Sequence, residues 1–438
     1  MKNKRLSRRD FLFVAGTAAL GTAIAACAPK TTATPAAGQA ENTPANAPTK
    51  ANEIMEINFW NGVGPPEGTL LEEFVYDYQT KHPELKINQW TTDWDPFYTK
   101  IRTVAAEGVG PDLCVTHPNY LATYADIVFK PIDDLVSVDK DIKPELFNQV
   151  PWDACFRNGK QYAIPMDAHL LCLYYNIDLL QKAGVNPPQS DNDLVEVAKS
   201  FTKSPDQWGI NTWFSGNGIY WTWLAYMSHY GQKGMLNSDN TKAVFNNDAG
   251  ASALQRIYDN IYTDKFSPGP DLGVDFATAF SQQKMAFCYD GTWMKFTWDA
   301  AKLNYSSVMF TKQQPGTWGN SHIFVFPRLG GAPKTQVAWD MAKYIVLNHS
   351  VDWGLKAGHV PALKSADQDP AYLATMPQMQ GFVDMLPYLV YLPRVPQQEA
   401  IGAEMQGSLS SVLRKEVSVK DALKKSEAKV NQLLATPL

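Results

Sequence analysis

The sequence predicts an α/β fold with two lobes. Short apolar segments alternate with amphipathic ones, an order typical of a sheet covered by helices on both faces. Residues 54–438 form a body of about 385 residues, which exceeds what one hydrophobic core usually organises. Charged residues make up 19% of the chain and hydrophobic residues 45%, a composition that excludes a disordered chain, a coiled coil and a collagen-like polymer.

The N-terminal segment predicts export rather than a part of the fold. Five basic residues precede a mostly apolar run from Phe11 to Ala26, which is short for a spanning helix and typical of a secretory signal. Residues 7–12 (SRRDFL) resemble a twin-arginine signal. We therefore predict a signal peptide over residues 1–26. An uncleaved N-terminal anchor is the alternative.

The segment after the signal predicts a lipid-anchored tether. Residues 24–27 (IAAC) resemble the lipobox of bacterial lipoproteins, in which cleavage leaves a Cys that is lipidated through its sulfur, here Cys27. Residues 28–52 are rich in Ala, Pro, Thr and Asn and have no aromatic side chain. Such a segment cannot bury enough surface to offset its chain entropy, so we predict a flexible tether over 27–53.

The first half of the body predicts a β-α-β-α-β run. Three short apolar segments predict strands, at 55–60, 85–90 and 113–115. An apolar stripe over 70–78 predicts a helix with a capping box formed by Thr69 and Glu72, and Asp95 with the following proline predicts the start of a second helix. Strands connected through helices pair in parallel, so this run predicts a parallel sheet with helices on both faces.

The alternation resumes after residue 160. Strands are predicted at 170–175, from 208, at 285–290 and at 323–327. Helices are predicted up to Gly184, at 190–201, 219–229, 249–262, 275–283 and 335–348, and from Ser418. The second half therefore predicts a further α/β unit followed by a helix-rich C-terminal region.

Charge argues against a nucleic-acid partner. The chain has 39 basic and 44 acidic residues, and residues 1–26 hold five of the basic and one of the acidic residues. The remaining 34 basic and 43 acidic residues give residues 27–438 a net charge of about −9. Phosphate binding needs a basic face, which an acidic body does not favour.

Catalytic and cofactor motifs are missing from the sequence. It holds no P-loop, GxSxG or HExxH motif, and residues 62–68 (GVGPPEG) depart from a dinucleotide fingerprint because Glu67 stands at the third glycine position. The seven His residues show no pair at helical metal spacing. Neighbouring acids such as Asp93 and Asp95 could serve a glycosidase but more commonly cap helices or face solvent. We predict a binding protein rather than an enzyme, with no cofactor and no metal.

Four cysteines remain beyond Cys27, at positions 114, 155, 172 and 288. An exported protein could pair them, but no compact disulfide framework is present, and three of them lie in apolar, strand-like runs. Disulfides and buried free thiols both stay open at this point.

Aromatic and polar residues recur together where predicted strands end. The chain has 13 Trp, 19 Tyr and 20 Phe. Ligands of open parallel sheets bind at the carboxyl ends of strands, and a Trp face covers a sugar ring while Asp, Asn and His bond its hydroxyls. The candidate ligand-binding residues are Trp60, Asn61, Asp93, Asp95, Asp167, His169, Trp213, Asp290, Trp293, Trp318 and His322. The alternative is that the aromatics fill cores and the acids cap helices.

Several collinear segments resemble the family 1 extracellular solute-binding proteins, the sugar-binding components of ABC importers. The most specific segments are INFWNG at 57–62, LEEFVYDYQTKHPELKI at 71–87, GKQYAIPMDAHLLCLYYN at 159–176, LLQKAGVNPP at 179–188, AFSQQKMAFCYDGTW at 279–293 and AGHVPALKS at 357–365. The resemblance implies a two-lobed, periplasmic-binding-protein-like (type II) fold that closes by a hinge around a ligand in the inter-lobe cleft. By analogy, lobe 1 would comprise 54–165 plus 305–350, and lobe 2 would comprise 166–304 plus 351–438.

The resemblance implies delivery of a carbohydrate, from a monosaccharide to an oligosaccharide, to the transmembrane subunits of an ABC permease. We expect an exported monomer, lipid-anchored at the outer face of the cytoplasmic membrane. Alternative ligands are a polyamine, a phosphorylated polyol or a peptide. Phosphate would favour cleft arginines, and none lies in the aromatic segments. A secreted glycoside hydrolase is the alternative from another class.

Overall fold

The computed structural model describes residues 54–107, 110–125 and 127–436. The signal peptide, Cys27 and the tether predicted for residues 1–53 lie outside the described residues. Strand pairing divides the described chain between a five-stranded and a seven-stranded sheet, with a small two-stranded sheet of β4 (Phe156–Arg157) and β5 (Lys160–Gln161). None of the helices in these residues combines the length and the apolar character needed to cross a membrane.

The five-stranded sheet contains the strands predicted for the first half of the chain. Its order is β2-β1-β3-β12-β6, with β1 at Met55–Asn61, β2 at Leu85–Thr91, β3 at Leu113–Thr116, β12 at Ile323–Val325 and β6 at Ala163–Pro165. The strands β1, β2 and β3 pair in parallel, which confirms the β-α-β-α-β run. Strand β12 is antiparallel to both of its neighbours, so the sheet is mixed rather than wholly parallel.

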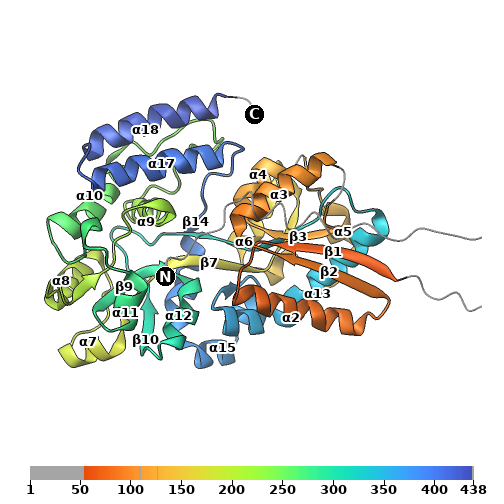
Figure 1. The fold of residues 1–438 in the computed structure, drawn as a ribbon, viewed down its shortest axis with the longest axis horizontal. Coiled ribbons are helices and arrows are strands. Elements are labelled where there is room, and N and C mark those ends of the chain that lie inside the picture. The colour runs from red at the N-terminus through yellow and green to blue at the C-terminus, as the bar shows by residue number, and fades with distance from the viewer. Residues whose placement is uncertain (1–53, 108–109, 126, 437–438) are drawn as a thin grey trace, which may run out of the picture. The chain divides into compact units, whose positions relative to one another are not determined.

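Helices α2 (Glu67–Lys81) and α13 (Ala332–Ala357) pack against each other beside this sheet (Figure 1). The predicted capping box of Thr69 and Glu72 is wrong, because α2 begins at Glu67 and its N-cap residue Pro66 makes no side-chain capping bond. Thr69 therefore lies inside the first turn. The Glu72 carboxylate instead accepts a hydrogen bond from the Thr91 hydroxyl at 3.1 Å.

The seven-stranded sheet is built around β7 (Asp167–Asn176), whose residues are almost all buried. Its order is β14-β11-β7-β9-β8, with β14 at Leu389–Val390, β11 at Thr317–Asn320, β9 at Met285–Gly291 and β8 at Trp208–Ile210. Strands β10 (Tyr305–Val308) and β13 (Val360–Pro361) also pair with β7. This sheet therefore combines strands that are spread along the chain from residue 167 to residue 390.

The remaining helices surround the two sheets. They are α3 (Trp94–Glu107), α4 (Leu121–Tyr124), α5 (Asp133–Val138), α6 (Gln149–Asp153), α7 (Ile177–Ala183), α8 (Asp191–Phe201), α9 (Gly216–His229), α10 (Asp248–Tyr262), α11 (Phe276–Ser281), α12 (Lys295–Ala300), α14 (Lys364–Asp367), α15 (Pro370–Thr375), α16 (Gln380–Met385), α17 (Gln398–Leu413) and α18 (Val419–Leu434). The predicted caps are confirmed where Gly184 ends α7 in a left-handed conformation, Ser190 forms a capping box with Asp193, and Ser418 caps α18.

Strand pairing departs from the expected lobe segments in two places. Residues 305–320 contain β10 and β11, which both pair with β7, although we expected them with the first sheet. Trp353 and Ala357 pack into the core of the first sheet, although residues from 351 onward were expected in lobe 2. A short strand pattern does not encode its pairing partner, which explains the first difference. We propose that the chain leaves the second lobe after β11, near residue 321.

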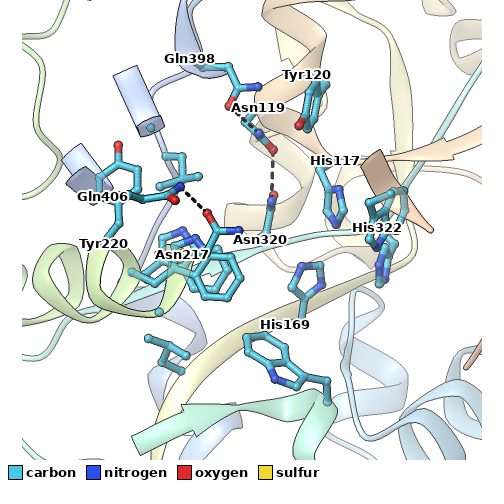
Figure 2. Close-up of a pocket in the computed structure, with 18 of the residues that line it drawn as sticks. His117, Asn119, Tyr120, His169, Asn217, Tyr220, Asn320, His322, Gln398 and Gln406 are labelled. Atoms are coloured by element: carbon cyan, nitrogen blue, oxygen red, sulfur yellow. Dashed lines mark hydrogen bonds between the residues drawn. The ribbon is translucent and has the colours of Figure 1, made fainter. Parts of the chain in front are cut away.

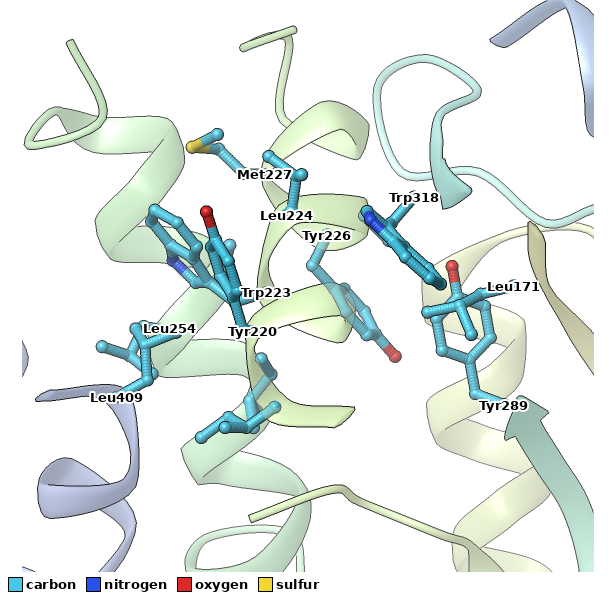
Figure 3. Close-up of a cluster of buried hydrophobic side chains, with 14 of the residues drawn as sticks. Leu171, Tyr220, Trp223, Leu224, Tyr226, Met227, Leu254, Tyr289, Trp318 and Leu409 are labelled. Atoms are coloured by element: carbon cyan, nitrogen blue, oxygen red, sulfur yellow. The ribbon is translucent and has the colours of Figure 1, made fainter. Parts of the chain in front are cut away.

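Helix α9 anchors the core of the second sheet (Figure 3). The indole nitrogen of its fully buried Trp223 donates a hydrogen bond to the Gly250 carbonyl at 2.9 Å. Tyr220 and Trp318 belong to the same core cluster and also face the cavity described below. The core therefore fixes the position of one wall of that cavity.

The four cysteines of the body are buried free thiols in the structure. Burial raises the pKa of the Cys114, Cys155, Cys172 and Cys288 thiols. A protonated thiol away from water is unreactive, so of the two possibilities left open by the sequence the structure favours buried thiols that contribute to packing.

Candidate functional site

A cavity of about 760 Å³ is lined by residues from both sheets and from α17. From the side of the first sheet come Glu67, Trp94, Asp95, Tyr98, His117, Asn119, Tyr120, His322 and His359. From the second sheet and its helices come His169, Trp213, Asn217, Tyr220, Trp221, Asp290, Trp293, Trp318, Asn320, Gln398, Glu399 and Gln406 (Figure 2). The volume falls in the range of small-molecule sites.

Seven of the residues predicted from strand ends line this cavity. They are Asp95, His169, Trp213, Asp290, Trp293, Trp318 and His322. Trp60, Asn61, Asp93 and Asp167 are not among the lining residues. The structure thus brings together residues that are more than two hundred positions apart in the sequence.

The side chains of Asn61 and Trp60 contact neighbouring residues of the first sheet and its loops. The fully buried Asn61 side chain accepts a hydrogen bond from the Val63 backbone at 3.0 Å and donates one to the Thr91 hydroxyl at 3.2 Å. Trp60 packs edge-on against Trp90, with ring centroids 4.9 Å apart, and the Lys100 ammonium lies 4.4 Å from its ring. These contacts fix the end of β1.

The other two residues outside the cavity differ in their surroundings. Asp93 is exposed before α3, where its carbonyl accepts the Phe97 amide. Asp167 is fully buried, and its carboxylate accepts hydrogen bonds from the His322 backbone at 2.8 Å, His322 Nδ1 at 2.7 Å and Trp353 Nε1 at 2.7 Å. Asp167 therefore orients His322 from behind the cavity wall.

The aromatic rings form two groups across the cavity. Tyr98 and Tyr120 are stacked with centroids 3.5 Å apart, on α3 and on the 3-10 turn Pro118–Tyr120. Opposite them, Trp221 of α9 is stacked on Trp318 of β11, with centroids 4.0 Å apart and an interplanar angle of 4°. Trp318 is only 2% exposed, so it backs Trp221, whose ring is the more accessible of the two.

Two glycines allow tryptophan rings to approach the backbone here. A Cβ atom on Gly291 would lie 2.1 Å from the ring of Trp293, and one on Gly218 would lie 2.5 Å from the ring of Trp213. Both distances are far below van der Waals contact, so a side chain at either position would displace the ring. These glycines therefore set the shape of the tryptophan wall.

Side-chain amides connect the two sides of the cavity (Figure 2). The Asn320 amide donates to the Asn119 oxygen at 3.1 Å, and the Asn119 amide donates to the Gln398 oxygen at 3.0 Å. On the other side, the Gln406 amide donates to Asn217 at 2.7 Å. Such neutral donors and acceptors suit a hydroxylated ligand.

Four of the seven histidines gather at the cavity, namely His117, His169, His322 and His359. Burial lowers the pKa of His169 to about 4, and burial together with the neighbouring histidines lowers that of His117. Burial also opposes a charge on His359, but Glu67 and Asp167 raise its pKa. His117 and His169 are therefore neutral at neutral pH.

Burial also governs the two buried acids. It raises the pKa of Asp290 to about 7, although the Gly291 amide donates to the Asp290 carboxylate at 2.7 Å. For Asp167, burial alone would raise the pKa, but the nearby His322 and His359 and the bonds that the carboxylate accepts hold it well below its usual value. Asp167 is thus ionised, and Asp290 is half protonated near neutrality.

Sequence reasoning missed several residues that line the cavity. Trp221 and Tyr220 lie on a helix whose apolar pattern is that of a core element, and His359 follows the end of α13. Gln398 and Gln406 lie on α17, far along the chain from any predicted strand end. A rule based on strand ends cannot find residues that helices bring to the cavity.

Comparisons with known proteins agree on the fold. The chain is 20% identical over 394 residues to a maltotriose-binding protein of Pyrococcus abyssi, covering 86% of this chain and 82% of the relative. It is 26% identical to an arabinooligosaccharide-binding protein of Bacillus subtilis over half of each chain. A similar solved structure is an ABC substrate-binding protein from Listeria monocytogenes in complex with cycloalternan, with a TM-score of 0.76 and 23% identity over 87% of this chain and 100% of that one.

Another similar structure is the sugar-binding protein MalE of Xanthomonas citri, with a TM-score of 0.77 and 20% identity over 87% of this chain and 98% of that one. The two sheets described above have the two-lobed, type II periplasmic-binding architecture of these neighbours. The family profile described as bacterial extracellular solute-binding protein matches residues 62–348 of the 438. This chain therefore belongs to the bacterial extracellular solute-binding protein family.

Proposed function

We propose that the protein binds a carbohydrate, from a monosaccharide to an oligosaccharide, and delivers it to an ABC permease. The observation that carries this proposal is a wall of tryptophan rings combined with polar groups that lack partners. The Nε1 atoms of Trp221 and Trp318 and the Nε2 atom of Gln398 are buried donors without an acceptor among the described residues. A sugar offers a flat apolar face to the rings and hydroxyl oxygens to such donors.

The charge of the cavity supports a ligand without phosphate. Four acids line it, namely Glu67, Asp95, Asp290 and Glu399, and the lining residues described by the structure include no Lys or Arg. Phosphate recognition relies on such cations, which disfavours a phosphorylated polyol. The acids beside the tryptophan faces favour a polyamine as the second candidate, because an ammonium group would be attracted to both.

A binding panel distinguishes these candidates. The purified protein is titrated with mono- and oligosaccharides and with spermidine, and intrinsic tryptophan fluorescence and the melting temperature are recorded. We expect at least one saccharide to change both signals, because Trp221 and Trp293 line the site. A response to spermidine and to no sugar would replace the carbohydrate by the polyamine. Release of reducing ends from an oligosaccharide would show a glycoside hydrolase instead.

We further propose that the protein is exported and anchored to the membrane by a lipid on Cys27. The solute-binding family and the predicted signal peptide support export, and the IAAC sequence that ends at Cys27 supports a lipid anchor facing the outside of the cytoplasmic membrane. A Cys27→Ala variant expressed in a bacterial host with lipoprotein processing should lose lipid labelling and appear in the soluble fraction. Continued membrane association of this variant would support an uncleaved anchor.

A further inference from the structure

The rings of His117, His169 and His322 lie close together at the cavity (Figure 2). The ring centroids of His117, His169 and His322 lie 5.4, 5.2 and 4.6 Å apart, and one ring nitrogen from each lies within 4.8 Å of the others. Three imidazoles bound to one tetrahedral ion through bonds of about 2.0–2.1 Å have their centroids roughly 5 Å apart. The observed separations match that arrangement after small ring rotations.

The three rings have nitrogen lone pairs to offer. His322 Nδ1 is paired with the Asp167 carboxylate at 2.7 Å, so Nε2 is the ring nitrogen left for a further partner. His117 Nδ1 is paired with the Tyr98 hydroxyl at 2.7 Å, which leaves its Nε2 for a further partner. His169 is 6% exposed, and its Nδ1 lies 3.5 Å from Asp167 without a hydrogen bond among the described residues.

The groups behind these rings resemble the outer shell of a metal site. A ligating His commonly donates its other ring N–H to a carboxylate or another acceptor, which fixes the ring and raises its basicity. Asp167 has this relation to His322, and it is itself held by the Trp353 indole at 2.7 Å. The Tyr98 oxygen can play the same part for His117.

A second possible group, made of Asp167, His169 and His359, is less suited to an ion. Asp167 already accepts three hydrogen bonds, and His359 is paired with Thr292 at 2.8 Å and faces Glu67 at 3.3 Å. The first group consists of residues that all line the cavity, so a fourth coordination position would open into it. Three histidines with one open position is an arrangement that zinc adopts.

We propose that His117, His169 and His322 bind one Zn²⁺ ion at the floor of the cavity, with Asp167 and Tyr98 orienting the ligands. The open position would take a water molecule or an oxygen of the bound solute. Imidazole suits zinc better than the hard cations Mg²⁺ and Ca²⁺, which prefer oxygen ligands. The ion requires no sugar, so this inference does not depend on the proposed function.

Metal analysis tests the inference directly. The full chain without a polyhistidine tag is stripped with a chelator, dialysed against micromolar Zn²⁺ alone, and analysed for zinc and protein. We expect about one ion per chain, and Co²⁺ in place of Zn²⁺ should give the visible absorption of a tetrahedral site. Absence of stoichiometric zinc from the wild-type protein would overturn the proposal and would mean that the rings bind only water or solute.

Variants locate the ion. His169→Gln and His322→Gln should each weaken Zn²⁺ binding at least about tenfold and abolish the Co²⁺ spectrum, and Asp167→Asn should weaken binding by about 10–100-fold. His82→Gln is the matched control, because the His82 side chain is 38% exposed, is paired with Glu84 and lies outside the cavity. Equal zinc binding by the cluster variants and the control would contradict the site.

Further measurements keep the test decisive if a buried variant unfolds. His117→Gln replaces the most accessible of the three ligands, and the melting transition of each variant shows whether it is folded. A folded His117→Gln variant that binds zinc as tightly as wild type would overturn the proposal. Sugar titrations in chelator report on the proposed function separately, so failure of either idea leaves the other measurable.

Discussion

The two walls of the cavity are built on different principles. The wall from the first sheet presents the stacked pair Tyr98 and Tyr120 beside Trp94 and His117. The wall from the second sheet presents Trp221, backed by the buried Trp318, together with Trp213, Trp293 and Asp290. Glycines and a core helix fix the tryptophan wall, whereas the tyrosine wall reaches α17 through side-chain hydrogen bonds and an exposed ion pair.

This difference indicates that the two walls contribute unequally to ligand binding. We expect the preformed tryptophan wall to supply most of the binding free energy, because its rings are ordered before the ligand arrives. We expect the tyrosine wall to add smaller contacts to the ligand when the lobes close.

The largest expected effect concerns the buried acid of the tryptophan wall. Burial raises the pKa of Asp290 to about 7 from the ordinary 3.8. At a pH between these two values, the Asp290 carboxyl is therefore protonated in the folded protein and ionised in the unfolded chain. The Asp290 contribution to the free energy of unfolding should therefore fall as the pH rises from about 4 to 7, by up to about 4 kcal/mol, and then level off. Denaturant titrations of wild type and Asp290→Asn across this range measure it.

The titratable groups next to Asp290 do not contribute to this pH dependence of the free energy of unfolding. Tyr174 and Cys288 face Asp290, and burial raises the pKa of both further above the window, so they stay neutral throughout. The difference between the two proteins isolates Asp290. A pH-independent difference would show that Asp290 has an ordinary pKa and that the tryptophan wall is wetter than its burial indicates.

The next effect concerns ligand affinity at the stacked pair. Trp221→Ala removes the accessible ring of the tryptophan wall, and the sugar that binds best should bind about 30-fold more weakly, a loss of roughly 2 kcal/mol. Trp60→Ala is the matched control, because Trp60 packs on Trp90 outside the cavity. Isothermal titration of the folded variants measures both affinities. Equal losses would remove the distinction between cavity and scaffold tryptophans.

A smaller effect is expected at the tyrosine wall. Tyr120→Ala should weaken sugar binding by about 1 kcal/mol, roughly fivefold, because the ring is half-buried and one face is already covered by Tyr98. The exposed Tyr76, which lies on α2 outside the cavity, provides the control Tyr76→Ala. A loss at Tyr120 equal to that at Trp221 would mean that both walls contribute alike.

The smallest effect concerns the ion pair that joins the tyrosine wall to α17. Arg102 and Glu399 lie 3.3 Å apart with side chains 50% and 46% exposed, so their coupling should stay below about 1 kcal/mol. A double-mutant cycle with Arg102→Ala and Glu399→Ala, read out as sugar affinity at low and high salt, measures it. Coupling that survives about 1 M salt would show a desolvated contact instead.

The sequence predicted seven of the described strands and most of the longer helices, because their apolar periods and caps are local, whereas short elements such as β10, β11 and β14 were not predicted. It also located Asp290, Trp293 and His322, because each lies at or near a strand end that faces the cavity. The same rule also named Asn61 and Asp167, which do not line the cavity: the Asn61 side chain bonds within its own loop, and Asp167 lies behind His322. Whether a residue at a strand end lines the cavity depends on its tertiary contacts, which the local sequence does not encode.

Other parts of the site could not be predicted for the same reason. Trp221 lies on a mostly buried helix, and nothing in its local pattern distinguishes a ring that faces a cavity from one that faces the core, such as Trp223. The histidines come from separate elements and have no common spacing. The strand β10 pairs with β7 across more than a hundred residues, which a local pattern does not encode.

The most direct test of the central claim is a crystal structure of the protein with the sugar that binds most tightly. We predict a sugar ring stacked on Trp221 or Trp293 in the cavity between the two walls, with its hydroxyls bonded to the amides and imidazoles that line it. A sugar bound elsewhere, for example against Trp60 and Asn61, would contradict the account.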